Sequence, residues 1–171
     1  MSAVAIRPER PSDREAALEV HRSAFGSEDE AKIVAAVRDE EGSFGLVAED
    51  DGEIIGHIQF SRAWIGATEV LALGPIGVRA DRQREGNGSE LIRAGVQEAR
   101  SRGEAAVILL GDPAFYPRFG FEPGSSRGLR NPFAGVQPDG FEIAEEDFML
   151  VVLDEAPLAG EVRWHPAFRL G

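Results

Sequence analysis

The chain has no cysteine, a single tyrosine and only three histidines among its 171 residues. Without cysteine it can form no disulfide, no thiolate metal site and no cysteine-bound acyl intermediate. Three scattered histidines give no metal-ligand pattern, so no metal is predicted. No apolar run approaches the roughly 20 residues that a membrane helix needs, and no signal-peptide pattern opens the chain. These absences predict a soluble, unprocessed cytoplasmic protein that does not act at a membrane.

Positive charge is also scarce. The chain has 18 Lys and Arg against 30 Asp and Glu, for a formal net charge of -12. A surface of this sign argues against a nucleic-acid backbone as partner. It favours either a cationic partner, such as an amine, or simply a solvated acidic surface.

The length suits one domain, and 43% hydrophobic residues suffice for a sizeable core. No repeat, low-complexity tract or linker divides the sequence, so we expect a single domain over 1–171. Apolar spacing predicts helices that begin at Ser12 and Ser27. β-rich runs predict strands at 4–6, 44–49, 53–60, 68–78, 105–110 and 148–153, the second and third of which form a hairpin. Residues 122–140 have little periodicity and predict a long loop.

The strand over 68–78 contains a defect. Pro75 follows Gly74, and a proline cannot donate to a strand ladder. The strand is therefore expected to be bulged, splayed or at an edge near Pro75. A polar, glycine-bearing loop follows, and then a helix whose apolar stripe ends before Gly103.

This loop is the most informative stretch of the sequence and reads Gln83-Arg84-Glu85-Gly86-Asn87-Gly88-Ser89. A turn of this kind exposes successive backbone N–H groups at a helix N-terminus, where the helix dipole favours a phosphate or pyrophosphate. Gly86 and Gly88 allow close approach, and Arg82 and Arg84 add positive charge. A tight glycine turn without a ligand is the alternative. The loop lacks the Gly-Lys-Ser/Thr ending of a P-loop and the full dinucleotide fingerprint.

Residues 78–91 resemble the acetyl-CoA motif of the GNAT (GCN5-related) N-acetyltransferases, in which Gln/Arg-x-x-Gly-x-Gly/Ala lies between a strand and a helix. The run from Tyr116 to Phe121 is similar to the Tyr-x-x-x-Gly-Phe ending of that family. Together with the tail at 164–168, residues 110–121 resemble the bacterial YhbS-like branch. One departure is that the cofactor-contacting asparagine of many members is absent at 109–111.

The resemblance implies an α+β GNAT fold, in which about four helices flank a mixed and mostly antiparallel sheet of six or seven strands, splayed at the fourth. It implies that Ile76, Gly77 and Val78 pair with the pantetheine arm of acetyl-CoA as an extra strand. It further implies that the loop binds the pyrophosphate through Gln83, Arg84, Glu85, Gly86, Asn87, Gly88 and Ser89.

The function implied is acetyl transfer from acetyl-CoA to a primary amine of a small molecule, peptide or protein, directly within a ternary complex. Tyr116 stands at the place of the family's general acid, and a phenol with an ordinary pKa of about 10 is protonated at neutral pH. Glu69, at the start of the strand that leads to the cofactor, is the predicted base, and His57 is an alternative, followed by His21 and His165. Arg127, Arg130, Trp64 and Phe133 could line the acceptor pocket.

Two other functions stay open at this level. A non-catalytic acyl-CoA-binding or sensing module would keep the loop and need no acid at Tyr116. A nucleotide-binding protein of another kind would keep the loop, but the phosphate lysine and the ribose carboxylate are missing. The tail at 164–168 could seal a homodimer or close the sheet of a monomer.

Overall fold

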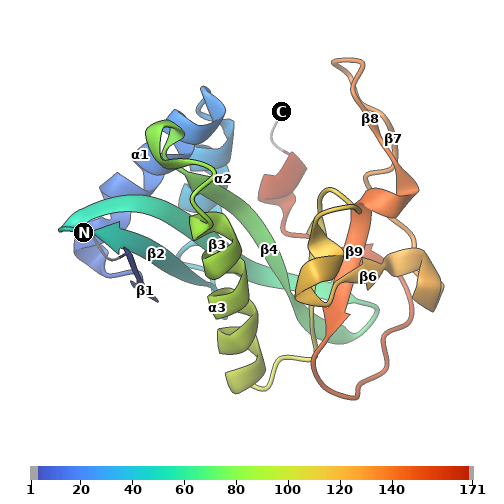
Figure 1. Cartoon of the computed structure of the whole chain (residues 1–171). Helices are drawn as coiled ribbons and strands as arrows, with labels where there is room; N and C mark the ends of the chain where they lie inside the picture. The colour runs from blue at the N-terminus through green and yellow to red at the C-terminus, as the bar shows by residue number, and fades with distance from the viewer. Residues whose placement is uncertain (1–3, 170–171) are drawn as a thin grey trace. The chain divides into compact units, whose positions relative to one another are not determined.

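A computed structural model describes residues 4–169, and these divide into two compact units (Figure 1). The first unit comprises residues 4–61, 73–98 and 165–169 of the described chain, and the second comprises residues 62–72 and 99–164. Two long strands and one helix pass from one unit into the other, so the chain crosses between units within regular elements. The single-domain organisation expected from the sequence remains a prediction.

Eight described strands form one mixed sheet, hydrogen-bonded in the order β1-β2-β3-β4-β5-β9-β6, with β10 paired to β3. The first unit holds β1 (Val4–Pro8), β2 (Phe44–Asp50), most of β3 (Glu53–Ile65) and the second half of β4 (Thr68–Val78). β1 pairs antiparallel with β2, and β2 antiparallel with β3 around the turn at Asp51 and Gly52. The predicted hairpin is confirmed, although β3 extends five residues beyond its expected end at Phe60.

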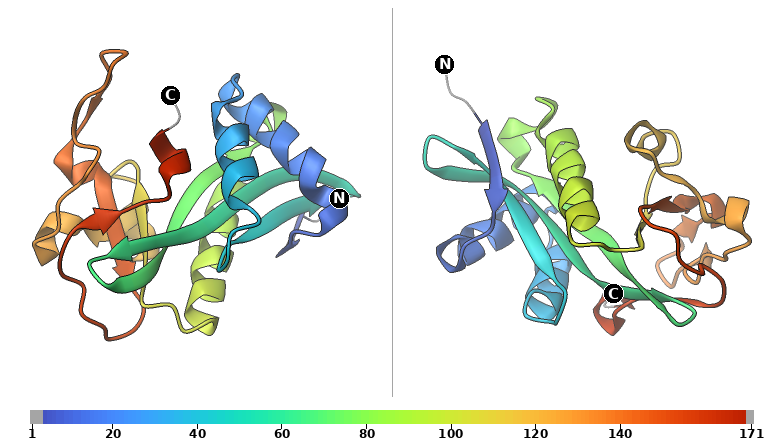
Figure 2. Two further views of the ribbon diagram at one scale, coloured as in Figure 1. Left: turned by 180° about the vertical axis from the view of Figure 1, so that it is seen from behind. Right: turned by 90° about the horizontal axis from the view of Figure 1, so that it is seen from below.

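Three helices cover the sheet of the first unit. α1 (Arg14–Phe25) and α2 (Asp29–Val37) lie on one face, and α3 (Asn87–Ser101) lies on the other (Figure 2). Pleating explains this arrangement, because alternate residues of a strand point to opposite faces. On β3, Gly56 and Phe60 contact α3, whereas His57 faces α1.

The start of α1 differs from the expected cap at Ser12. A 3₁₀ turn, η1 (Pro11–Asp13), precedes the helix, and the Asp13 carboxylate accepts the Arg10 backbone N–H at 2.7 Å. Arg7 donates to the same carboxylate at 2.7 Å, which holds the pKa of Asp13 below its usual range. Asp13 is the residue before α1, but its carboxylate makes no cap bond to that helix, because it closes η1 and pairs with Arg7 instead.

The second unit is built on β5 (Ala106–Leu110) and β9 (Phe148–Val152), which pair antiparallel. β4 pairs parallel with β5 at Leu71–Val107 and Ala72–Ile108. The short strands β6 (Glu122–Pro123) and β10 (Val162–Arg163) add to the sheet, and β7 (Gly135–Val136) and β8 (Glu142–Ile143) form a separate two-stranded hairpin. Its core consists of buried apolar side chains, among them Ile65, Ala72, Ile108, Phe148 and Leu150.

The structure corrects the expected helix number, because the described residues contain three α-helices rather than about four. The segment 113–119, in which the sequence would also allow a short helix, contains only a single 3₁₀ turn, η3 (Tyr116–Phe119). Pro117 lies in its first turn, and Gly120, at φ 95°, turns the backbone into the left-handed region and ends it. Residues 122–140 also contain more structure than the expected loop, since β6, β7 and the 3₁₀ turn η4 (Gly124–Arg127) lie there.

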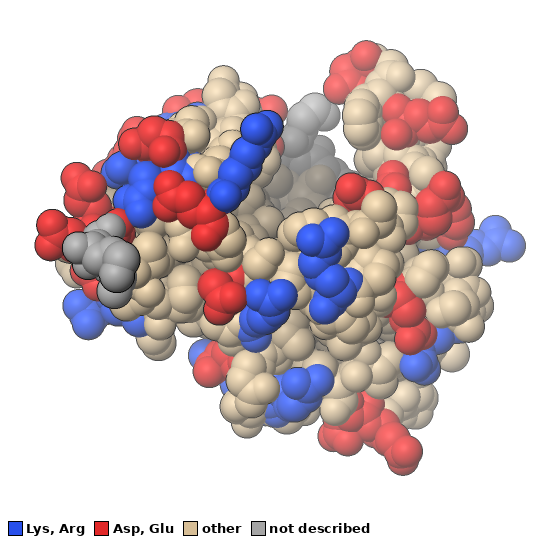
Figure 3. Space-filling view, viewed as in Figure 1, with Lys and Arg blue, Asp and Glu red and all other residues tan. Residues whose placement is uncertain are grey.

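On the face shown in Figure 3, acidic side chains lie at several separate places with Lys and Arg side chains between them. This interspersed pattern does not form the basic stripe that a nucleic-acid backbone would need. Across residues 4–169, no helix has both the length and the apolar character required to cross a membrane.

Candidate active site

The glycine loop connects the 3₁₀ turn η2 (Ala80–Arg82), which follows β4, to α3, and it lies within the first unit. The side-chain amide of Gln83 donates to the carbonyl of Val78 at 3.0 Å, which ties the loop to the end of the strand. Arg84 at φ 66° and Gly86 at φ 88° adopt the left-handed conformation. These two residues turn the chain sharply, so that Asn87 can begin the helix.

The first turn of α3 carries the backbone donors of the site. The N–H of Glu90 bonds to the carbonyl of Gly86 at 3.1 Å, as in a regular helix. The N–H groups that precede it have no carbonyl within the helix to bond to, because a helix leaves its first donors unpaired. With the positive dipole end of a 15-residue helix, they form a site suited to a phosphate or pyrophosphate.

Only part of the predicted positive charge remains available at this loop. Arg82 is paired with the buried carboxylate of Asp50 at 2.8 Å and with Glu85 at 3.1 Å. Arg82 is thus paired from two sides and braces the loop against β2, and its contribution of charge to phosphate binding stays a prediction. Arg84 is exposed, and among the described residues no ion pair holds its guanidinium.

The strand segment predicted to receive the pantetheine arm lies directly before the loop. In β4, Gly77 is buried while Ile76 and Val78 are half-buried. Gly88, in the first turn of α3, lies near Val78, so that a β-carbon at Gly88 would be 3.8 Å from a methyl group of Val78. The structure thus brings 76–78 and 83–89 together in one unit, as the sequence predicted.

Tyr116, the predicted acid, lies in the second unit at the start of η3. Its ring makes edge contacts with Phe115 at 5.2 Å and Phe121 at 5.8 Å between centroids. Gly111 makes room for the ring, since a β-carbon there would lie 2.8 Å from its Cδ2 atom. Burial, together with the carboxylate of Asp112, raises the pKa of Tyr116 above that of an ordinary phenol. The hydroxyl therefore keeps its proton at neutral pH and can donate it.

Glu69, the predicted base, is the second residue of β4 and also lies in the second unit. Its side chain is exposed, and among the described residues no hydrogen bond or ion pair joins it to Tyr116. The local structure around Glu69 thus offers no partner that would orient or activate its carboxylate.

His57 is not the isolated histidine that the sequence suggests. Its Nδ1 atom lies 2.8 Å from Nε2 of His21, and both side chains are fully buried. The two residues are 36 positions apart, on β3 and α1. No spacing rule connects them, so the pair could not be found from the sequence.

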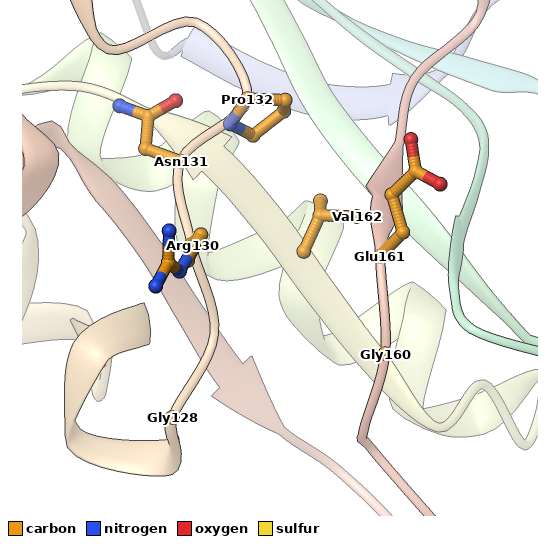
Figure 4. A pocket seen from close by; sticks show the side chains of 7 residues that line it. All are labelled: Gly128, Arg130, Asn131, Pro132, Gly160, Glu161 and Val162. Carbon is orange, nitrogen blue, oxygen red and sulfur yellow. The ribbon is translucent and has the colours of Figure 1, made fainter.

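A hollow of about 540 Å³ in the second unit is lined by residues from two segments (Figure 4). Arg130 comes from the segment 128–132 and Glu161 from the segment 160–162. The other residues proposed to line an acceptor pocket are engaged elsewhere. Arg127 pairs with Glu122, Arg163 lies 5.5 Å above the ring of Trp64, and Phe133 packs against Trp164.

Known proteins resemble this chain over most of its length. The model of the acetyltransferase (GNAT) family matches residues 12–121. The uncharacterized N-acetyltransferase YhbS of Escherichia coli K12 is 36% identical over 137 residues, which cover 77% of this chain and 81% of that protein.

Solved structures agree. The crystal structure of Escherichia coli YhbS in complex with CoA has a TM-score of 0.87 at 31% identity, covering 100% of this chain and 95% of that one. A GNAT family acetyltransferase from Brucella melitensis, in complex with acetyl-CoA, has a TM-score of 0.78 at 33% identity, with 97% and 98% covered.

Proposed function

Because this chain belongs to the GNAT family of N-acetyltransferases and is therefore an acyltransferase, we propose that it moves an acetyl group from acetyl-CoA to a primary amine. The amine belongs to a small molecule, a peptide or a protein, and the transfer occurs directly in a ternary complex. The observation that carries the proposal is the glycine loop at the N-terminus of α3, tied to β4 through Gln83 and Val78.

In the proposed complex the loop holds the pyrophosphate of acetyl-CoA. The donors are the unpaired N–H groups from Gly86 to Ser89, and the exposed guanidinium of Arg84 adds a positive charge. Gln83 keeps the turn in place, and Glu85 acts through its backbone because its carboxylate is occupied by Arg82. Relatives solved with CoA or acetyl-CoA support this assignment.

The backbone of Ile76, Gly77 and Val78 is proposed to pair with the pantetheine arm. The regular ladder between β4 and β5 spans only Leu71 and Ala72 on the β4 side, all within the second unit. The part of β4 after Gly74 thus has main-chain groups to offer to a ligand. An N–H group beside the thioester carbonyl would stabilise the negative charge that develops there.

Tyr116 is proposed to protonate the departing thiolate. An acid for this step must hold its proton at neutral pH until the thiolate leaves, and the buried phenol of Tyr116 does so. For the base, the sequence predicts Glu69, and the structure offers a second candidate, His21, which is argued in the next subsection. We further propose that the protein works in the cytoplasm as a monomer or homodimer and needs no metal.

Acetyl-CoA is expected to raise the melting temperature of the protein, whereas ATP and NADH at equal concentration leave it unchanged. A ligand that binds only the folded state stabilises it, by about 2.7 kcal/mol at 100 times its Kd. A thermal-shift titration measures the effect, with CoA and longer acyl-CoAs as further ligands. An unchanged melting temperature with every acyl-CoA would refute the assignment of the loop.

A negative charge placed in the first turn of α3 should weaken acetyl-CoA binding without unfolding the protein. Ser89→Glu adds a carboxylate that favours the helix N-terminus but repels a pyrophosphate. Like charges brought together cost several kcal/mol, so we expect Kd to rise by about tenfold or more in calorimetry. Ser101→Glu, the same change at the other end of the same helix, serves as control and should bind as wild type does. Equal affinity in the two variants would place the pyrophosphate elsewhere.

A further inference from the structure

Three buried side chains of the first unit form a continuous array. His57 on β3 lies between two partners: its Nδ1 is 2.8 Å from Nε2 of His21 on α1, and its Nε2 is 3.1 Å from Oε1 of Glu9. Both histidines have no exposed surface, and the side chain of Glu9 is 10% exposed. Buried polar groups are costly to leave unpaired, so an array of this kind calls for an explanation.

The chemistry of the array determines where its protons sit. Nε2 of His57 and Oε1 of Glu9 do not meet the geometry of a hydrogen bond, but a carboxylate oxygen 3.1 Å away attracts an N–H and repels a lone pair. The nitrogen of His57 that faces Glu9 therefore carries the proton. The other nitrogen of a neutral His57, Nδ1, is then an acceptor, and it takes the Nε2 proton of His21. By the same rule Nδ1 of His21 has no proton and presents a lone pair. The carboxylate of Glu9 thus orients both rings and leaves a base at the far end.

That free nitrogen faces the cofactor strand. A β-carbon at Gly77 would lie 3.0 Å from Nδ1 of His21, so any larger residue there would press against the ring. Among the described residues, Nδ1 of His21 has no hydrogen-bond partner. Gly77 is one of the residues proposed to pair with the pantetheine arm. The base end of the array therefore lies against the backbone where the thioester is expected.

His21 lies one turn before the end of α1. Phe25, whose ring stacks on that of His21 at 6.2 Å, is 48% exposed and is followed by Gly26 in the left-handed conformation. Last turns of helices open more easily than their centres. The use of Nδ1 as a base requires this single turn to move, so that substrate or one water molecule reaches the nitrogen.

The surroundings disfavour a charged ring. Burial, with contributions from His57 and Arg38, lowers the pKa of His21 to about 3. The other charged groups that face the array are Glu9 and Arg38, whose Nη2 lies 3.7 Å from Oε1 of Glu9. An isolated imidazolium at His21 is therefore unstable. A proton can still be accepted if another leaves the ring at the same time, because each histidine then stays neutral.

We propose that Glu9, His57 and His21 form a proton relay that deprotonates the attacking amine, a role that rests on the acetyl transfer proposed above. As the amine nitrogen bonds to the carbonyl carbon and the carbon–sulfur bond breaks, the nitrogen loses one proton to Nδ1 of His21. The Nε2 proton of His21 passes to Nδ1 of His57, and the Nε2 proton of His57 passes to Glu9. The thiolate is protonated by Tyr116. After the products leave, the relay runs in reverse, Nδ1 releases the proton to solvent, and Tyr116 regains its own from solvent.

The test uses a substitution that removes only the base. His21→Gln places an amide N–H near the former Nε2 and keeps the contact with His57, but it has no atom in place of Nδ1. We expect kcat to fall about 10²-fold, the size of a lost general base, while the melting-temperature shift with acetyl-CoA is unchanged. His165→Gln makes the same change at a histidine outside the array and should keep full activity.

A merely structural role predicts a different pattern. In a relay, His21→Gln combined with His57→Asn should be about as slow as either single variant, because both break one path. If the two residues only contributed packing, the free-energy effects of the two single variants would add in the double variant. Thiol release is measured with acetyl-CoA and a panel of spermidine, lysine and a peptide with a free N-terminus.

One readout needs no activity. Nitrogen-15 NMR of the histidine rings should show Nδ1 of His21 unprotonated and Nε2 protonated between about pH 5 and 9, since the ring stays neutral there. The opposite tautomer, or full kcat in His21→Gln, would overturn the relay while leaving the acetyltransferase proposal intact. Absence of thiol release from wild type with every amine would instead overturn the proposed function and the relay with it.

Discussion

Replacing Tyr116 by phenylalanine is expected to lower kcat for acetyl transfer by about 10²-fold or more while leaving acetyl-CoA binding unchanged, since general acids contribute roughly 10²–10⁴ in rate. The change deletes one hydroxyl and keeps the ring. The aromatic contacts with Phe115 and Phe121, and the space left by Gly111, would all remain. Only the proton for the leaving thiolate would be lost.

The raised pKa of Tyr116 gives the effect a pH signature. The acid works only in its protonated form, which dominates below the pKa and is lost as the pH rises through it. In wild type, the loss of rate from this ionisation should therefore begin only above pH of about 10, the ordinary phenol value. Tyr116→Phe has no phenol to titrate, so this alkaline fall should vanish from its kcat profile, measured by thiol release.

The same variant separates the enzyme from a non-catalytic acyl-CoA-binding module. The melting temperature of Tyr116→Phe and its shift with acetyl-CoA serve as controls, and both should equal those of wild type. A variant as fast as wild type would show that Tyr116 is a packed aromatic residue and not the acid. The thiol would then leave with a proton from another donor.

Gly95→Ala is expected to destabilise the protein by about 1–3 kcal/mol, the usual cost of overpacking a buried contact. Gly95 lies on the buried face of α3, and a methyl group there would overlap the end of the Phe60 ring. Phe60 is fully buried and stacked on Phe44 at 4.7 Å between centroids, so its ring cannot withdraw. The clash occurs at the contact between Gly95 and Phe60, which positions α3, and with it the glycine loop, against β3.

Gly88→Ala is the matched control in the same helix. Its new β-carbon would meet Val78 at 3.8 Å, an ordinary contact, and alanine is the better helix former. Thermal denaturation should show little loss or a slight gain for Gly88→Ala. For Gly95→Ala the melting temperature should fall by about 2–4 °C for each kcal/mol lost in a chain of this size. Equal melting temperatures in the two variants would show that α3 adjusts and that Phe60 does not set its position.

Local signals account for what the sequence predicted correctly. The hairpin of β2 and β3, the strand β4, the helix α3 and the strands β5 and β9 all lie where period and turn residues indicate. Gln83, Gly86 and Gly88 form the predicted loop because its conformation depends on neighbours within a few residues. Each of these elements is encoded by a short stretch of chain, and so are the two motifs from which the family was predicted.

The predictions that failed depended on more than a short stretch. The start of α1 differs from the expected cap because the Asp13 carboxylate closes η1 and is held by Arg7 from β1. The two-residue strand β10 has no periodicity of its own and exists because it pairs with β3 at Ile65 and Trp64. The ion pair of Arg82 with Asp50, 32 positions earlier, likewise has no local signal in the sequence.

The sequence by itself therefore determined the element order, the glycine loop that we propose binds the pyrophosphate, and Tyr116 as the candidate acid, since each is encoded by residues near one another in the chain. Only the tertiary structure decided that Glu9, His57 and His21 meet, with the last of them against Gly77. The physical reason is that this buried array of polar side chains is assembled by the packing of α1 on β3 and by the segment after β1, which carries Glu9. Its members share no spacing, and only folding brings their side chains within bonding distance.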